Sequence, residues 1–194
     1  MEAIFERKTT NGDPRIRIYS GKFISLVNPL VSDIQLVDIA HHLSNICRFT
    51  GSTITLYSVA QHSVAVSKIV SPENALWGLL HDASEAYLGD VSSPLKYYLN
   101  GKYRELEDRF MSVICEKFGL PPIEPEEVYE ADKIMYVTER RDLMVVDGPS
   151  LDFPHKPLDE RIRCWEPLRA KYEFLERFTD LYLGDSGWRE PNGV

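Results

Sequence analysis

Apolar residues recur at helical spacing along most of this chain, and this periodicity limits the folds that it can adopt. The clearest apolar stripe consists of Leu76, Leu79, Leu80, Ala83 and Tyr87. These residues fall on one face of a helix with about 3.6 residues per turn. Ser71-Pro72 precedes the stripe as a cap followed by proline, and Gly89 follows it as a suitable C-terminal stop. One helix is therefore predicted from Ser71 to Leu88.

Five other segments are predicted to be helical by the same reasoning. They span about 36–47, 58–70, 103–118 and 125–146, and the last follows Pro167. The segment 58–70 opens with a capping box, in which Ser58 caps the helix and Gln61 reaches back to it. Residues 147–157 contain Gly, Ser, Asp and three prolines, so they are expected to form a loop.

Strand-like alternation is present in two short stretches, Arg15–Tyr19 and Thr53–Tyr57, which we expect to pair as a small ribbon. A length of 194 residues suits one domain with a sizeable core. The predicted fold is mostly α, a single domain over 1–194 with a minor two-stranded β element. Its core is expected to span about 36–183, with loosely held ends at about 1–14 and 188–194.

Composition and charge exclude several classes of function. The formal net charge of −8 argues against a surface for nucleic-acid polymers, because such surfaces need clustered Lys and Arg. A bound divalent cation would still allow a small phosphorylated substrate. No apolar run approaches the roughly 20 residues that span a bilayer, and the N-terminus lacks the apolar stretch of a secretory signal. We therefore expect a cytoplasmic protein with no membrane partner and with reduced cysteines.

The segment that carries most chemical information is His81-Asp82-Ala83-Ser84-Glu85-Ala86-Tyr87-Leu88-Gly89-Asp90. On a helix, His81, Asp82 and Glu85 project from neighbouring positions. An imidazole nitrogen and a carboxylate oxygen together suit Mn, Fe, Co, Ni or Zn, with Mg as a further candidate. Glu85, beside the two candidate ligands, is placed to orient or deprotonate a water molecule or to protonate a leaving group.

Two further candidate ligands lie on other predicted helices. His62 is one turn inside the helix that Ser58 caps, and Asp132 lies in the segment 125–146. Three helices could thus converge on one divalent ion with two imidazoles and two carboxylates. Octahedral coordination would leave two positions for water or a substrate oxygen, and open positions are typical of a catalytic metal.

The order His62, His81-Asp82 and Asp132 resembles the H…HD…D pattern of the HD-domain superfamily of metal-dependent phosphohydrolases. The longer pattern HDxxExxxGDxxxPLK, from His81 to Lys96, is similar to the bacterial 5′-deoxynucleotidases of that superfamily. The stretch from Tyr57 to Ser63 is similar to them as well. The chain also resembles the small phage deoxynucleoside triphosphohydrolases. The matching region covers roughly 38–143.

This resemblance implies an HD-domain helical fold and a role for several residues. Arg48 matches the position of an arginine that grips substrate phosphate in those enzymes, and Lys96 is a second candidate for the phosphate. Glu85 and Asp90 are expected to handle protons. Phe49 departs from the pattern, because the bacterial nucleotidases carry a tryptophan beside the arginine.

The function that the resemblance implies is removal of phosphate from deoxynucleoside 5′-monophosphates, with one divalent transition metal as cofactor. A close alternative is a hydrolase that releases triphosphate from deoxynucleoside triphosphates. An alternative of another class is a non-catalytic, nucleotide-binding regulatory protein that retains the fold. The expected partners are a small-molecule nucleotide and further copies of the chain, as a homo-oligomer.

Overall fold

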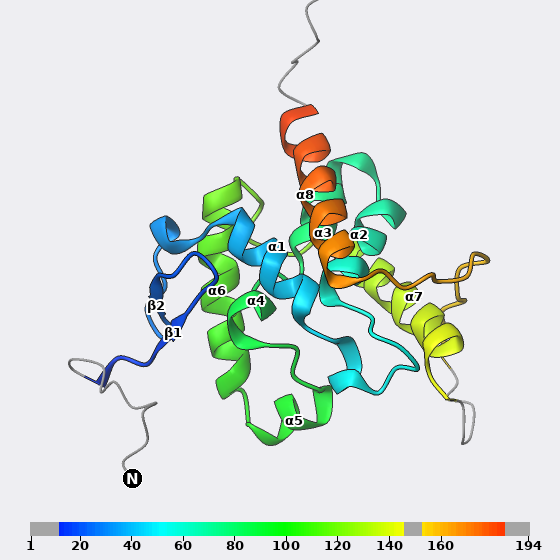
Figure 1. Cartoon of the computed structure of the whole chain (residues 1–194), viewed down its shortest axis with the longest axis horizontal. Coiled ribbons are helices and arrows are strands. Elements are labelled where there is room, and N and C mark those ends of the chain that lie inside the picture. The colour runs from blue at the N-terminus through cyan, green and yellow to red at the C-terminus, as the bar shows by residue number, and fades with distance from the viewer. Residues whose placement is uncertain (1–11, 146–152, 185–194) are drawn as a thin grey trace, which may run out of the picture.

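The computed structural model describes residues 12–145 and 153–184, which form a mostly helical fold with a small two-stranded sheet (Figure 1). The expected fold class is thereby confirmed. The elements in chain order are β1 (Arg15–Arg17), β2 (Phe23–Ser25), α1 (Leu36–Asn45), α2 (Val59–Ile69), α3 (Ala75–Leu80), α4 (Glu85–Leu88), α5 (Ser93–Tyr98), α6 (Lys102–Phe118), α7 (Glu126–Leu143) and α8 (Pro167–Leu183).

Only one of the two predicted strands is present in the sheet. β1 pairs antiparallel with β2, with Ile16 opposite Ile24. The prediction that Thr53–Tyr57 is the partner strand is wrong. In that stretch the Thr53 hydroxyl donates to the Thr55 carbonyl at 2.6 Å, which favours a local bend over a strand. The true partner, β2, is only three residues long and shows no alternation that a sequence pattern would detect.

The single helix predicted from Ser71 to Leu88 is also wrong, because the chain forms α3 and α4 with a turn between them at residues 81–84. In a continuous helix the Gly78 carbonyl would accept from the Asp82 amide. Here His81 Nδ1 lies 2.8 Å from that carbonyl instead. The next amides bond three residues back, as Ala83 does to Leu80, which tightens the chain into a turn.

The remaining helix predictions are confirmed with small shifts of their ends. Ser58 caps α2, and its side chain accepts from the Gln61 amide. Gln61 does not reach back to complete the capping box, because its side chain bonds the backbone of Arg163 and Trp165. Helix α5 was not predicted. Of the expected loop at 147–157, residues 153–157 contain no helix or strand. Its other residues, and most of the expected loose ends, lie outside the described residues.

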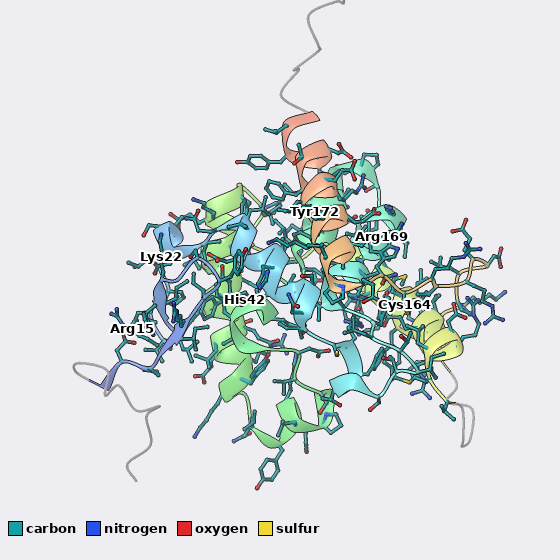
Figure 2. The ribbon with its side chains drawn as sticks, viewed as in Figure 1. Arg15, Lys22, His42, Cys164, Arg169 and Tyr172 are labelled. Atoms are coloured by element: carbon teal, nitrogen blue, oxygen red, sulfur yellow. The ribbon has the colours of Figure 1, made fainter. Side chains whose placement is uncertain are left out.

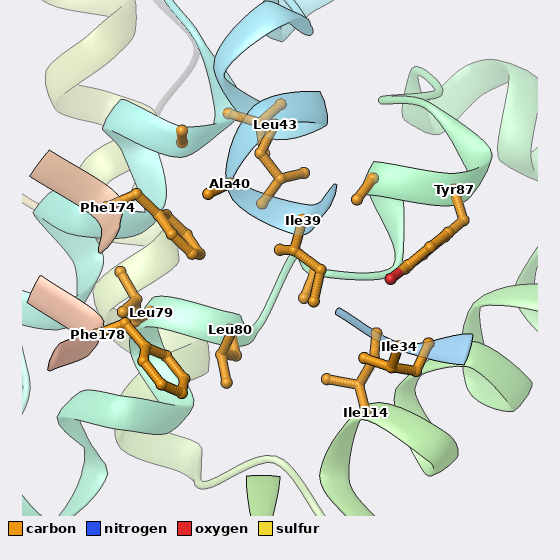
Figure 3. Packing of buried hydrophobic residues seen from close by; sticks show 14 of the residues in the cluster. Ile34, Ile39, Ala40, Leu43, Leu79, Leu80, Tyr87, Ile114, Phe174 and Phe178 are labelled. Carbon is orange, nitrogen blue, oxygen red and sulfur yellow. The ribbon is translucent and has the colours of Figure 1, made fainter. Parts of the chain in front are cut away.

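The main apolar core lies where α1, α3, α4, α6 and α8 meet (Figure 3). Phe174 of α8 is fully buried, as are Ile39 of α1 and Leu79 of α3. Each such side chain contributes about 1.5–3 kcal/mol by leaving water. The opposite face of α8, which carries Arg169 and Tyr172, is exposed (Figure 2).

Helix α2 is the central element, because it packs against α1, α3, α7 and α8. Eight of its residues are buried, and four of these are polar. His62 is one of them, so this ligand candidate enters the interior on a helix held from several sides. A buried imidazole must find partners, and α7 and the turn between α3 and α4 supply them.

A second histidine shows how a purely structural contact differs. His42 of α1 places Nδ1 2.5 Å from the Ala86 carbonyl, while its Nε2 accepts from the Tyr19 amide at 3.0 Å (Figure 2). Both ring nitrogens therefore have backbone partners, and the ring ties the end of the β1 hairpin to α4. None of the described helices is long and apolar enough to cross a membrane.

Candidate metal centre

The four predicted ligands come together from three parts of the fold. Nε2 of His62 lies 3.2 Å from Nε2 of His81 and 3.2 Å from Oδ1 of Asp132. Asp82 Oδ2 lies 3.2 Å from the His81 nitrogen and 3.6 Å from the His62 nitrogen. The donor atoms of His62, His81 and Asp132 all fall within 4.8 Å of one another. The predicted convergence is therefore present in the folded chain.

Local structure explains why each ligand points inward. His62 follows the Ser58 cap by one turn, and its amide bonds the Ser58 carbonyl at 3.1 Å. His81 and Asp82 lie in the turn between α3 and α4, which allows adjacent residues to face the same point. Asp132 is four residues after Val128 on α7, and Val128 is fully buried, so the two share one helix face.

The two imidazole rings have their outer nitrogens engaged and their inner nitrogens facing each other. His62 Nδ1 lies 2.6 Å from a carboxylate oxygen of Glu139. His81 Nδ1 lies 2.8 Å from the Gly78 carbonyl, which can only accept. Each Nδ1 thus carries the hydrogen, and each Nε2 is left to act as an acceptor or a ligand. This is the arrangement that second partners impose on metal-binding histidines.

The charges around these nitrogens also fit a divalent cation. Asp82, Asp132 and Glu139 lie near a single guanidinium, that of Arg48. Lys133 also lies 3.5 Å from Asp132, so the three carboxylates still outnumber the two cationic side chains near them, and a cation would neutralise the remaining negative charge. The mixture of two nitrogens and two carboxylate oxygens suits a first-row transition metal. His62, His81, Asp82 and Asp132 would hold it.

The titration behaviour of the ligands reflects this excess of negative charge. Burial lowers the pKa of His81, but the Asp82 and Asp132 carboxylates and the Gly78 carbonyl together raise that pKa to about 9. Burial raises the pKa of Asp132, but the bond with His62 and the charges of His62, His81 and Arg48 together hold that pKa well below its ordinary value. His81 therefore holds an additional proton beside these carboxylates when no cation is bound, and metal binding should release that proton.

Arg48 lies beside the candidate ligands, and its side chain is largely buried. Its guanidinium donates to Glu139 at 3.0 and 3.1 Å and to Asp82 at 3.4 Å. The next two residues, Phe49 and Thr50, have positive φ values of 55° and 52°. Non-glycine residues rarely adopt this conformation, and it often marks functional sites. The Phe49 ring packs against Tyr136 of α7, with ring centroids 5.8 Å apart.

Glu85 and Asp90, near the candidate ligands, carry carboxyl groups whose pKa values are raised. Glu85 is buried, and its Oε2 has no hydrogen-bond partner within the described part of the chain. Burial raises the pKa of Glu85 well above its ordinary value, and the Asp82 and Asp90 carboxylates add to the effect. Burial also raises the pKa of Asp90. A carboxyl group with a raised pKa is suited to serve as a general acid.

Lys96 lies at the rim rather than among the ligands. Its ammonium pairs with Glu107 of α6 at 2.7 Å and lies 3.9 Å from Glu85. It also lines a cavity of about 750 Å³ together with Tyr97, Tyr98 and Arg104. The structure thus places Lys96 beside the candidate acid, while its strongest contact is with a residue outside the centre.

Glu139 belongs to the centre and was not predicted. Its side chain is fully buried and contacts both His62 and Arg48. A signal for it was present in the sequence, because Glu139 follows Asp132 by seven residues and Met135 by four. These intervals place it on the same helix face as the ligand and the buried methionine.

Comparison with known proteins shows the family of the chain. No protein-family model matches it. It is 43% identical over 174 residues to YfdR, an uncharacterised protein of Escherichia coli K12, and the match covers 86% of this chain and 94% of YfdR. The chain belongs to the YfdR family. A second uncharacterised relative, from Rhodobacter capsulatus, is 37% identical to this chain over 126 residues. The match covers 60% of this chain and 64% of that protein.

Proposed function

We propose that this chain is a metal-dependent phosphohydrolase of the HD-domain type that removes phosphate from deoxynucleoside 5′-monophosphates. The observation that carries the proposal is the convergence of His62, His81, Asp82 and Asp132, with Nε2 of the two rings 3.2 Å apart. The resemblance of the segment His81–Lys96 to bacterial 5′-deoxynucleotidases supports the choice of substrate.

The bound cation would lower the pKa of a water molecule and neutralise charge on the phosphoryl group. Arg48 would hold phosphate oxygens that are not displaced, a task for which its forked donors are suited. The Arg48 guanidinium lies 3.4 Å from Asp82, so cation and phosphate would meet at adjoining positions. Three carboxylates and a dianionic phosphate would repel each other without such cationic groups.

Glu85 would provide the proton that the leaving alcohol needs. Its Oε2 is buried and unpartnered among the described residues, and its raised pKa favours the protonated form of the carboxyl group. Asp90 would share this proton handling. Lys96, at 3.9 Å from Glu85, would contact the outer phosphate oxygens if it leaves its ion pair with Glu107.

The proposal also includes a cytoplasmic location and a homo-oligomeric state. All three cysteines, Cys47, Cys115 and Cys164, are free, as in proteins of the reducing cytoplasm. Helix α8 exposes Leu168, Tyr172 and Leu183, and these apolar side chains support a homo-oligomer. Light scattering of the purified chain would measure its mass in solution.

The deciding experiment is a screen of purified protein against nucleoside mono- and triphosphates with Mn²⁺, Co²⁺, Mg²⁺, Ni²⁺ and Zn²⁺, with each product identified. Release of orthophosphate from deoxynucleoside monophosphates is the expected result. Release of triphosphate from deoxynucleoside triphosphates would replace the proposal by the triphosphohydrolase alternative. Nucleotide binding without turnover under every metal would favour the regulatory alternative.

A further inference from the structure

Glu139 of α7 is a fully buried carboxylate that contacts two different parts of the candidate centre. One oxygen, Oε1, lies 2.6 Å from His62 Nδ1. The other, Oε2, accepts from Arg48 Nη2 at 3.0 Å and from Arg48 Nε at 3.1 Å. A metal-ligand candidate and the phosphate-binding candidate are therefore held by opposite ends of one carboxylate.

We propose that Glu139 is a positioning residue that orients His62 toward the cation and holds Arg48 beside the cation, so that the metal ion and the phosphate are bound at adjacent positions. The part that concerns Arg48 rests on the proposed function. The part that concerns His62 rests on the geometry of the four ligands. A carboxylate on Nδ1 fixes the ring orientation, leaves Nε2 free for the cation and makes that nitrogen a stronger ligand.

The distances around Arg48 show what Glu139 prevents. The guanidinium also lies 3.4 Å from Asp82 and 4.0 Å from Asp132, both of which are ligand candidates. Without Glu139, the ion-pair partners of the buried guanidinium within residues 12–145 and 153–184 would be these ligand carboxylates alone, and a cation would have to compete with it. Because the shortest contacts go to Glu139, the carboxylates of Asp82 and Asp132 remain available to the metal.

The variant Glu139→Gln tests the proposal because glutamine keeps the shape and loses the symmetry of the carboxylate. Its amide has one accepting oxygen and one donating nitrogen, so either His62 or Arg48 must face a donor. Calorimetric titration with Mn²⁺ or Co²⁺ alone should show affinity about 10- to 100-fold weaker than in the wild type. Inorganic phosphate should also bind more weakly to the Zn²⁺-loaded variant.

Asp142→Asn is the matched control, since Asp142 is a buried carboxylate on the same helix that pairs with Arg141 and Arg161. It should leave the affinity for Mn²⁺ and Co²⁺ unchanged. If Glu139→Gln bound these cations as tightly as the wild type, Glu139 would be a structural ion-pair partner and the proposal would be overturned. Equal weakening in both variants would overturn it as well.

A measurement on the unaltered protein decides the question if Glu139→Gln does not fold. Nitrogen NMR of the histidines in the Zn²⁺-loaded chain should show His62 protonated at Nδ1, in a strong hydrogen bond, and coordinated through Nε2. Coordination through Nδ1 would contradict the proposal. Neither test uses turnover, so a chain that binds cations but hydrolyses no nucleotide would refute the proposed function and leave the role of Glu139 at His62 intact.

Discussion

Helix α7 takes part in two clusters of charged residues that differ in whether their charges are balanced. Around Asp142, the carboxylate accepts from Arg141 at 2.7 and 2.9 Å, from Arg161 at 2.6 Å and from the Ile162 amide at 2.9 Å. Arg141 in turn donates to the carbonyls of Leu158 and Glu160. Every partner is supplied by the protein, and the cluster fastens residues 158–162 to α7.

Around Asp132 and Glu139, the partners do not balance. The three carboxylates outnumber the two nearby cationic side chains, Arg48 and Lys133, and two imidazole nitrogens face each other at 3.2 Å. One buried oxygen of Glu85 has no hydrogen-bond partner within the described ranges. Buried charge alone therefore does not indicate function, because a balanced network serves the fold. An excess of charge with converging donors indicates a site that awaits a ligand.

Removal of a ligand carboxylate should have the largest effect. Asp82→Ala deletes an oxygen that lies 3.2 Å from His81 Nε2, and we expect both cation binding and turnover to be lost. A cation at a hundred times its dissociation constant stabilises a protein by about 2.7 kcal/mol. Thermal unfolding with and without Mn²⁺ should show this gain in the wild type and none in Asp82→Ala. Full activity in the variant would refute the ligand assignment.

Replacement of the candidate acid should separate chemistry from binding. Glu85→Gln keeps the size of the side chain but cannot transfer a proton, so kcat should fall by about 10²- to 10⁴-fold. The affinity for the cation should stay close to that of the wild type, because Glu85 is not among the proposed ligands. Steady-state kinetics and metal titration of the same preparation measure both quantities. A variant with wild-type kcat would remove Glu85 from the mechanism.

The balanced cluster should respond in the opposite way. In Asp142→Asn, the neutral amide cannot accept from all the donors that Arg141, Arg161 and Ile162 present. The free energy of unfolding should drop by about 1–3 kcal/mol, as measured with a chemical denaturant. Cation affinity and kcat should not change. A loss of cation affinity in this variant would mean that the two clusters are coupled and that the contrast between them is false.

The sequence predicts the ligands of the centre better than its geometry. His62, His81, Asp82 and Asp132 could be chosen as ligand candidates from residue type, from the spacing of the HD segment and from the resemblance to HD-domain proteins, without knowledge of packing. The turn at residues 81–84 could not, since it depends on the His81 ring reaching the Gly78 carbonyl, a contact that competes with the helical ladder. The role of Glu139 depends on α2 and Arg48 packing against α7, so its spacing alone could suggest burial but not its partners.

The fold shows the same division between local and distant information. Helix ends that depend on nearby residues, such as the Ser58 cap of α2 and the end of α6 at Phe118, were predicted correctly. The partner of β1 was not, because Phe23–Ser25 is only three residues long and shows no strand-like alternation in the sequence. Gln61 fits a capping box in sequence, but the folded chain offers it the backbone of Arg163 and Trp165 instead.

Acid should reduce the contribution of the balanced cluster in a defined direction. Hydrogen bonds from Arg141 hold the pKa of Asp142 well below its ordinary value of 3.8. A carboxyl group whose pKa is lower in the folded state stabilises the fold fully above its unfolded pKa, and this stabilisation is lost as pH falls toward the folded pKa. The difference in unfolding free energy between wild type and Asp142→Asn should therefore be constant from neutral pH down to about 5 and shrink below about 4.

Denaturant titrations of both proteins along this pH range measure this difference. Subtracting the two free energies cancels the contribution of the carboxylates of the centre, which both proteins share. A difference that stays constant to pH 3 would show that the ionised carboxylate is not what fastens residues 158–162, and that side-chain shape at position 142 is what matters.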